Sequence, residues 1–394
     1  MPKTMLLTYR QDLERELGHI LDWWVKYAID REQGGFQGRI DNENVAEPGA
    51  ARGVVLNSRI LWTFSAAARA RQNDAWMAVA DHAWQYLQQH FIDRRYGGVY
   101  WSVAPDGQPL NTRKQIYGLA FALYGLVEYY RAGGPKEALD EGIELFHWIE
   151  KHSFDGVRGG YFEAFARDGS ALTDWRLSER DRNDPKTMNT HLHILEAYAN
   201  LYRVWQDPLL AQRLRHLIHV FLDQIINPLS GHLCLFFDTG WAPQSDIISY
   251  GHDIEAAWLL QEAAGVLGDP VLLQKCRDNA VIMATAAARG LDTTDGGLWF
   301  ENHVAEKHWW VQAEAMVGFL NAWQISGEAQ FLQKSLGCWQ FTQQYLLDKN
   351  HGEWFWGVDA QRQVMPGEDK AGFWKCPYHN GRACLELLER LEEV

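Results

Sequence analysis

The hydrophobic positions along this chain follow two helical patterns in alternation. Residues 117–130 are apolar on nearly every side, as in a helix that is buried all round. The next segment, 135–152, is apolar only along the stripe that holds Ile143, Phe146 and Ile149, so its other side should face solvent. The same pair, a buried helix followed by an amphipathic one, is predicted six times along the chain.

A short glycine-centred motif separates successive helix pairs and also occurs six times. Each copy joins a glycine turn to a brief run of alternating aromatic residues, and several copies end in a second turn such as Asp106-Gly107. These features predict a small β-hairpin between the amphipathic helix of one pair and the buried helix of the next. The six copies occupy residues 30–36, 93–101, 155–162, 228–233, 294–300 and 350–356.

Repeated units of this size stack on one another, and six of them favour a closed ring. We therefore predict an all-α fold, an (α/α)6 barrel with short β-hairpins at one end, formed by a single domain over residues 1–394. The buried helices would form the inner ring, with their N-termini at the end that carries the hairpins. The competing architecture is an open α-solenoid, which would not return on itself. The predicted inner helices begin near Val54, Gln115, Met188, Gly251, Trp309 and Tyr378.

Composition adds a high aromatic content to this picture, with 19 Trp, 15 Tyr and 17 Phe in 394 residues. Such residues either fill a large helical core or stack on sugar rings, and composition alone leaves both interpretations open. The formal net charge is −14. This charge argues against nucleic acids and anionic membranes as partners, because phosphate binding needs clustered Lys and Arg.

Neither the first residues nor the cysteines suggest export. Residues 1–12 lack the apolar core and the cleavage site of a signal peptide, and no apolar run reaches the ~18 residues of a membrane span. The five cysteines are scattered and contain no Cys-x-x-Cys, which is typical of free thiols in a reducing compartment. We expect a cytoplasmic protein, present as a monomer or a small homo-oligomer.

Polar residues gather at the heads of the predicted inner helices. His252 and Glu255 are at i and i+3, with Trp258 near the same line, and a carboxylate beside an imidazole would fix its tautomer. An apolar helix rarely carries these three groups together unless they face a cavity. Trp310 and Glu314 repeat the pattern at i and i+4, although an ordinary buried pair would have the same spacing.

The helix predicted from Met188 carries two histidines, of which only one can face the lumen. Asn189 and His193 are four residues apart and share a face, whereas His191 points nearly opposite to His193. Geometry therefore selects His193 as the candidate site residue. A lone histidine on an apolar helix is more often a core residue with satisfied hydrogen bonds, and that alternative stays open.

His379 and Arg59 complete the candidate set. His379 follows the loop 372–378 at the head of the last inner helix, and Arg59 is a charge inside an apolar helix that needs an anion or several acceptors. Imidazoles exchange protons near neutral pH and an arginine stabilises an enediolate oxygen, so these groups suggest proton transfer at carbon. The sequence lacks His-Glu-x-x-His and glycine-rich nucleotide motifs, so we expect no metal and no cofactor.

The stretches that carry these residues resemble the cellobiose 2-epimerases, members of the N-acylglucosamine 2-epimerase superfamily, and the likeness spans nearly the whole chain. That family has an (α/α)6 barrel, in agreement with the repeat count. The resemblance implies a cofactor-independent isomerase that inverts C2 of a small-molecule sugar. The stretches are residues 57–62, 176–198, 251–258 and 374–380.

The resemblance also implies a role for each candidate residue. His252 and His379 would be the two acid/base groups at C2, and His193 would assist ring opening or polarise the C1 oxygen. One histidine would remove the C2 proton to give a cis-enediolate, and the other would return a proton to the opposite face. The residues that would bind the sugar, orient the histidines or shape the pocket are Arg59, Tyr117, Asn189, Glu255, Trp258, Trp310, Glu314 and Trp374.

The sequence leaves several substrates and several reactions open. The sugar could be a β-1,4 disaccharide such as cellobiose, or free mannose or glucose. Aldose–ketose isomerisation is possible because the proton could return to C1 of the same enediolate. A glycoside hydrolase would use Glu255 and Glu314 as its paired carboxylates and leave the histidines without a role, and a non-catalytic sugar-binding protein would show no turnover.

Two segments could decide specificity. The polar loop 171–186 is a candidate lid, although a solvated charged loop would have the same composition. The stretch before Trp374 is the second segment, because it leads directly to the head of the last inner helix.

Overall fold

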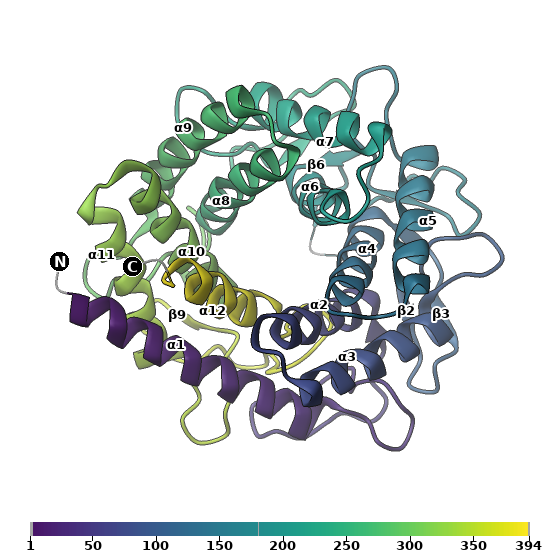
Figure 1. The fold of residues 1–394 in the computed structure, drawn as a ribbon, viewed down its shortest axis with the longest axis horizontal. Coiled ribbons are helices and arrows are strands. Elements are labelled where there is room, and N and C mark those ends of the chain that lie inside the picture. Colours follow the sequence, from purple (N-terminus) through teal and green to yellow (C-terminus); the bar gives the residue numbers. More distant parts are fainter. Residues whose placement is uncertain (1–2, 180, 393–394) are drawn as a thin grey trace.

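Two concentric rings of helices make up the structure. In the computed structural model, which describes residues 3–179 and 181–392, twelve α-helices alternate along the chain between the two rings (Figure 1). The outer ring consists of α1 (Lys3–Trp23), α3 (Asp74–Tyr86), α5 (Lys136–His152), α7 (Pro208–Val220), α9 (Pro270–Ala287) and α11 (Ala329–Phe341). The inner ring consists of α2 (Val54–Arg71), α4 (Ile116–Arg131), α6 (Met188–Tyr202), α8 (Tyr250–Leu267), α10 (Trp309–Ser326) and α12 (Tyr378–Arg390).

The inner ring is closed. Each inner helix packs against the next one, and α12 packs against both α10 and α2. The predicted (α/α)6 barrel is therefore confirmed, and the open solenoid is wrong because the last repeat contacts the first. Every inner helix begins within one residue of its predicted start.

Helices α4 and α5 show how the hydrophobic pattern separates the rings. Every residue of α4 from Ile116 to Tyr129 is buried, as expected for a helix that is apolar all round. In α5 the buried residues, among them Leu145, Phe146 and Ile149, form one stripe. The all-round pattern thus marks an inner helix and the striped pattern an outer one.

All six predicted hairpins are present. Each is closed by an antiparallel bridge between residues seven apart, and the turn takes glycines with positive φ, such as Gly97 (φ 73°) and Gly98 (φ 70°). Several outer helices lead into their hairpin through a short turn: a π-helical turn at 24–28, 87–91, 221–225 and 342–346, and a 3₁₀ turn at 288–290. The bridges are Ile29–Phe36, Ile92–Val99, Phe154–Tyr161, Ile226–Leu233, Leu291–Leu298 and Leu347–Trp354.

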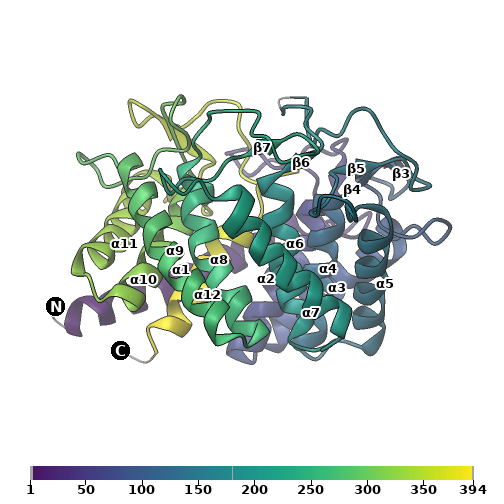
Figure 2. The same ribbon diagram turned by 90° about the horizontal axis from the view of Figure 1, so that it is seen from above.

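Short antiparallel strands connect neighbouring repeats at the same end of the barrel (Figure 2). The strands that precede α2, α4, α6 and α10 each pair with a strand of the following repeat, and one sheet gains a third strand. The sheets are β1-β2-β3 (Arg52–Gly53, Ser102–Val103, Pro109–Asn111), β4-β5 (Lys114–Gln115, Ala164–Phe165), β6-β7 (Lys186–Thr187, Phe236–Phe237) and β8-β9 (Glu306–His308, Gly357–Asp359).

A buried ion pair locks most hairpins to the inner helix that follows. In the second repeat, Asp93 accepts backbone N–H groups of its own turn through Oδ1, and its Oδ2 lies 3.0 Å from Lys114 Nζ. The fourth repeat instead has Asn227 at the hairpin and Ile248 two residues before its inner helix. Both charges are absent together, which avoids a buried unpaired ion. The equivalent pairs are Arg52–Asp30, Lys186–Asp155, Lys307–Asp292 and Lys370–Asp348.

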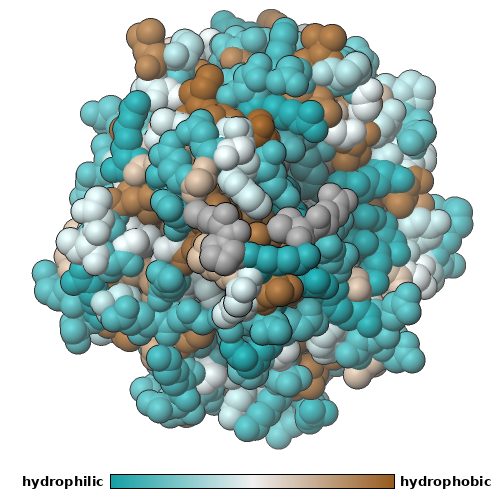
Figure 3. Space-filling view, turned by 60° about the vertical axis from the view of Figure 1, so that its left-hand side comes forward, coloured by the Kyte–Doolittle hydropathy of each residue, from teal (hydrophilic) through white to brown (hydrophobic). Residues whose placement is uncertain are grey.

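The exterior is mostly hydrophilic, with apolar residues scattered over the face in Figure 3. In the part of the chain that the structure describes, no helix is long and apolar enough to cross a membrane. All five cysteines have free thiols, as predicted.

Candidate active site

Equivalent positions of the inner helices supply most of the candidate residues. The helices of a closed ring are related by one repeat, so the same position faces the axis in each of them. The sixth residues of α2, α6, α8 and α10 are Arg59, His193, Glu255 and Glu314, all almost fully buried. The second residues of α4, α6, α10 and α12 are Tyr117, Asn189, Trp310 and His379, and His252 is the third residue of α8.

Arg59 is a buried guanidinium that no carboxylate neutralises directly within residues 3–179 and 181–392. Its Nη2 donates to the Tyr117 hydroxyl at 2.8 Å, and its Nε has no hydrogen-bond partner. Its Cζ lies 4.0 Å from the centre of the Phe121 ring and 4.9 Å from that of Tyr378. A guanidinium held against aromatic faces without a counterion is suited to receive an anionic oxygen.

The three candidate histidines are all anchored through Nδ1. Among the described residues, no hydrogen bond engages the Nε2 of any of them, so this nitrogen remains available to a ligand. The anchoring contacts join His193 to Glu196 Oε1 at 2.6 Å, His252 to Ser249 Oγ at 2.7 Å, and His379 to Glu314 Oε1 at 2.7 Å.

Trp310 contacts both of the histidines predicted to act at C2. Its ring centre is 4.8 Å from that of His252 and 5.6 Å from that of His379. Trp310 and Trp374 are half-buried, which leaves part of each ring accessible. Trp258 is fully buried and donates from Nε1 to Glu314 at 3.0 Å, so it bears on the site through that carboxylate.

The predicted pairing of His252 with Glu255 is wrong. His252 bonds to Ser249, which immediately precedes α8, and Glu255 accepts a hydrogen bond from Arg382 at 2.8 Å. The imidazole nearest to Glu255 is that of His379, whose Nδ1 lies 3.9 Å from Glu255 Oε1. The i, i+3 spacing brings two residues to one side of a helix, but a buried arginine from another helix is the stronger partner for the carboxylate.

Arg382 and three glutamates form a buried group that we name the Arg382 cluster. Nη1 of Arg382 donates to Glu196 Oε2 at 2.7 Å. Nη2 of Arg382 donates to Glu255 Oε1 at 2.8 Å and to Glu314 Oε1 at 2.6 Å. The four residues come from four inner helices, α6, α8, α10 and α12. The cluster therefore links four of the six inner helices through one guanidinium.

Burial sets the protonation states of the site. It lowers the pKa of His252 and of His379 to about 3, and it lowers the pKa of His193 well below its usual value. Burial alone would raise the pKa of Glu314, but Arg382 and His379 hold that pKa at about 2. The site without sugar thus presents neutral imidazoles and an ionised Glu314 near pH 7.

Glu255, Glu314 and His379 offer three potential metal ligands within 4.8 Å of one another. Arg382 already donates to both of these carboxylates. A metal ion would have to displace that guanidinium, so the donor set fits an arginine better than a cation from solution.

His191 holds the backbone around its hairpin, which is consistent with the prediction that it points away from His193. Its Nδ1 lies 2.6 Å from the backbone oxygen of Thr187, and its Nε2 accepts the backbone N–H of Tyr161 at 2.9 Å. It is the fourth residue of its inner helix. The fourth residues of α8 and α10, Asp253 and Gln312, hold the backbone of their own hairpins in the same way.

Three site residues were missed by the sequence analysis. Glu196 follows His193 by three residues, the same spacing that drew attention to His252 and Glu255. Arg382 is a charge inside an apolar inner helix, as Arg59 is. Both could have been found with the criteria already applied, whereas nothing marked Ser249 as the partner of His252.

The loop 171–186 lies over the start of α4. The Arg113 guanidinium donates to the backbone oxygen of Asp174, and the Gln115 amide donates to that of Arg176, each at 2.6 Å. Nearby, Asn189 is half-buried and its Oδ1 has no hydrogen-bond partner. Arg180 of this loop lies outside the described residues, and the role of the loop as a lid stays a prediction.

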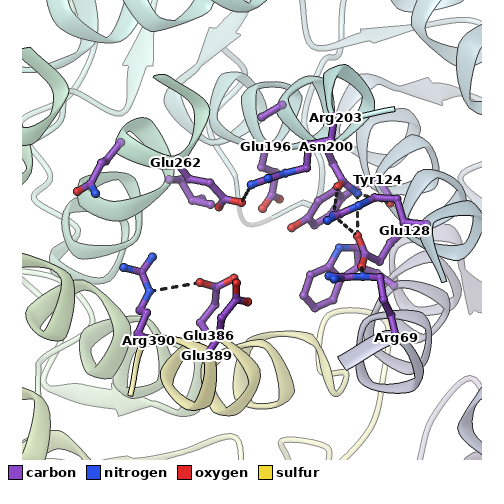
Figure 4. Close-up of a pocket in the computed structure, with 15 residues that line it drawn as sticks. Arg69, Tyr124, Glu128, Glu196, Asn200, Arg203, Glu262, Glu386, Glu389 and Arg390 are labelled. Atoms are coloured by element: carbon purple, nitrogen blue, oxygen red, sulfur yellow. Dashed lines mark hydrogen bonds and ion pairs between the residues drawn. The ribbon is translucent and has the colours of Figure 1, made fainter. Parts of the chain in front are cut away.

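A cavity of about 260 Å³ opens at the opposite end of the barrel (Figure 4). The charged side chains that line it pair with one another: Arg203 with Glu262 at 2.7 Å, Arg131 with Glu128 at 2.7 Å, and Arg390 with Glu386 at 3.3 Å. Glu196 lines this cavity and also anchors His193. Glu196 therefore lies between this cavity and His193.

Comparison with known proteins adds to this geometry. The family model of N-acylglucosamine 2-epimerase (GlcNAc 2-epimerase) matches residues 34–383. The chain is 48% identical over 386 residues to a cellobiose 2-epimerase of Bacteroides fragilis, covering 96% of this chain and 98% of that protein.

Solved structures with the same fold are also found. The cellobiose 2-epimerase of Spirochaeta thermophila superimposes with a TM-score of 0.92 at 41% identity, covering 99% of this chain and 98% of that one. A D-mannose isomerase superimposes with a TM-score of 0.84 at 21% identity, covering 96% and 98% of the two chains, and this likeness concerns the fold alone.

Proposed function

Because this chain belongs to the N-acylglucosamine 2-epimerase family and is a sugar 2-epimerase, we propose that it acts on the reducing-end sugar of a β-1,4 disaccharide. The reaction interconverts cellobiose and glucosylmannose by inversion at C2, with two histidines as acid and base. The support for this substrate class is the 48% identity, over nearly the whole chain, to a protein named cellobiose 2-epimerase. The site geometry supports the chemistry.

One observation carries the mechanism: His252 and His379 both lie against Trp310, and each is anchored through Nδ1. Two imidazoles with available Nε2 atoms can address opposite faces of one carbon. Their neutral state near pH 7 suits proton abstraction, and the carboxylate of Glu314 stabilises the imidazolium form of His379.

The steps follow from these positions. The pyranose opens: Nε2 of neutral His193 accepts the proton of the C1 hydroxyl while the bond between C1 and the ring oxygen breaks, and the ring oxygen takes a proton from solvent. One histidine takes the C2 proton, and the electron pair of the C–H bond forms the cis-enediolate, whose negative oxygen pairs with Arg59. The intermediate turns about its C2–C3 bond. The second histidine, protonated at Nε2 by solvent, then delivers that proton to the other face of C2. The first histidine releases the C2 proton to solvent, and the ring closes.

The hydrolase alternative finds little support in the carboxylates. A glycosidase needs two carboxyl groups that flank the scissile bond on opposite sides. Here Glu255 and Glu314 both bind Nη2 of Arg382, so they lie side by side on one group.

Proton NMR in D₂O with purified protein tests the proposal, using cellobiose and mannose separately. We expect the C2 epimer of cellobiose to form faster than glucose forms from mannose, with deuterium at C2. Faster turnover of mannose would replace the disaccharide by a monosaccharide as substrate. A ketose product would contradict epimerisation, and release of glucose from cellobiose would indicate a hydrolase.

A further inference from the structure

Arg382 has no direct place in the proton-transfer steps, yet it contacts the groups that hold two of the three histidines. Glu196 receives Arg382 Nη1 on Oε2 and presents Oε1 to His193 at 2.6 Å. Glu314 receives Arg382 Nη2 on Oε1, the same atom that binds His379 at 2.7 Å. One guanidinium thus contacts the carboxylates that anchor a histidine of α6 and a histidine of α12.

The guanidinium is itself fixed. Its side chain is 1% exposed, and its Cζ lies 4.2 Å from the centre of the Tyr378 ring and 4.8 Å from that of Trp258. Tyr378 also donates to Glu196 at 2.6 Å. The N–H donors of a planar guanidinium point in fixed, forked directions, so one arginine can orient several carboxylates. The ammonium group of a lysine does not provide this geometry.

Each carboxylate determines which ring nitrogen of its histidine carries the proton. An acceptor at Nδ1 keeps the hydrogen there and leaves the lone pair on Nε2, the nitrogen that makes no hydrogen bond among the described residues. If either glutamate rotated away, the imidazole could adopt the other tautomer and lose its function as a base. The charged and titratable groups around the two histidines and their carboxylates are Arg59, Tyr117, Tyr124, Glu196, Glu255, Glu314, Tyr378 and Arg382.

We propose that Arg382 is a positioning residue of the epimerase reaction, which sets the tautomers of His193 and His379 together through Glu196 and Glu314. This inference rests on the proposed function for its kinetic consequence, but not for the tautomers. Because the guanidinium touches no reacting atom, its loss should lower turnover more than sugar affinity.

The variant Arg382→Lys keeps the charge and removes the fork. We expect kcat to fall by about 10²-fold, the scale of a small misplacement of a catalytic group, with KM within a few-fold of the unaltered protein. Arg203→Lys is the matched control, since Arg203 pairs with Glu262 at the far end of the barrel. A rise in KM with kcat unchanged in Arg382→Lys would overturn the proposal.

Nitrogen-15 NMR of the imidazoles gives a readout that needs no turnover. In the unaltered protein, the resonances of His193 and His379, assigned from His193→Gln and His379→Gln, should both show protonated Nδ1 and unprotonated Nε2. In a folded Arg382→Lys protein the two should lose that single tautomer together. An Nε2–H tautomer at either histidine of the unaltered protein would overturn the proposal. Correct tautomers in a protein that epimerises no sugar would refute the proposed function alone.

Discussion

Nδ1 of His379, the second residue of α12, lies 2.7 Å from Oε1 of Glu314, the sixth residue of α10. The contact crosses between two neighbouring inner helices, 65 residues apart in the chain. It gives an imidazole at the head of one helix the carboxylate of another, which is an arrangement suited to acid/base chemistry. The predictions below test this arrangement and the fold that holds it.

Removal of either C2 histidine should nearly abolish epimerisation. We expect His252→Ala and His379→Ala each to lower kcat at least ~10²-fold, because each removes a proposed general acid or base. Initial rates with cellobiose, followed by NMR, measure the effect. Near-normal rates in either variant would exclude that histidine from proton transfer.

The two histidines of α6 should separate catalysis from stability. His193→Ala should lower kcat in a protein that melts near the normal temperature, because the proposed mechanism gives His193 a part in ring opening. His191→Ala removes one hydrogen bond to the hairpin, from Tyr161, and one to the backbone of Thr187, so it should cost about 1–3 kcal/mol of unfolding free energy and leave the kcat of folded protein almost unchanged. Thermal unfolding and steady-state kinetics on both variants check this, and the reverse pattern would mean that the assignment of the two faces is wrong.

The pH dependence of kcat/KM should reflect buried, neutral histidines. Burial lowers the pKa of His252 and His379 to about 3, so the basic form persists above that value and is lost only as the pH falls toward it. Since kcat/KM reports the free enzyme, we expect no acid limb between pH 5 and 7, the range of an ordinary imidazole (about 6.5). A limb with a midpoint near pH 6.5 would show that a histidine of the free enzyme titrates normally.

The hairpin ion pairs should contribute strongly to stability. Lys186→Met leaves Asp155 buried without its cation, and breaking such a pair costs about 3–5 kcal/mol. Lys136→Met is the control, because the Lys136–Asp140 pair is exposed and its loss should change little. Urea unfolding near pH 7 measures both, and equal effects would contradict the repeated ion pair as a structural element.

The Lys186–Asp155 pair also predicts the direction in which acid changes the free energy of unfolding. Backbone N–H groups and Lys186 overcome the burial of Asp155 and lower its pKa, so its stabilisation is present above the usual value of about 4 and is lost as the pH falls below it. The destabilisation caused by Lys186→Met should therefore shrink on acidification. A difference that grows toward low pH would contradict this linkage.

The sequence by itself determined the barrel. Six glycine hairpins and six pairs of all-round and striped apolar helices were legible because burial imposes a local period on each segment. The lumen-facing side of α6 followed from the same rule, which separated His193 from His191. Spacing along one helix is enough to decide such questions, since residues four apart share a face in any context.

Only the tertiary structure decided which polar groups bind one another. Glu255 was assigned to His252 by its spacing, but Arg382 from a helix 127 residues later in the chain takes that carboxylate. Likewise Glu314 of the neighbouring helix anchors His379. Such choices depend on the distances between helices after the ring has closed, because a buried charge binds the complementary group that packing brings closest. No local pattern in the sequence contains that information.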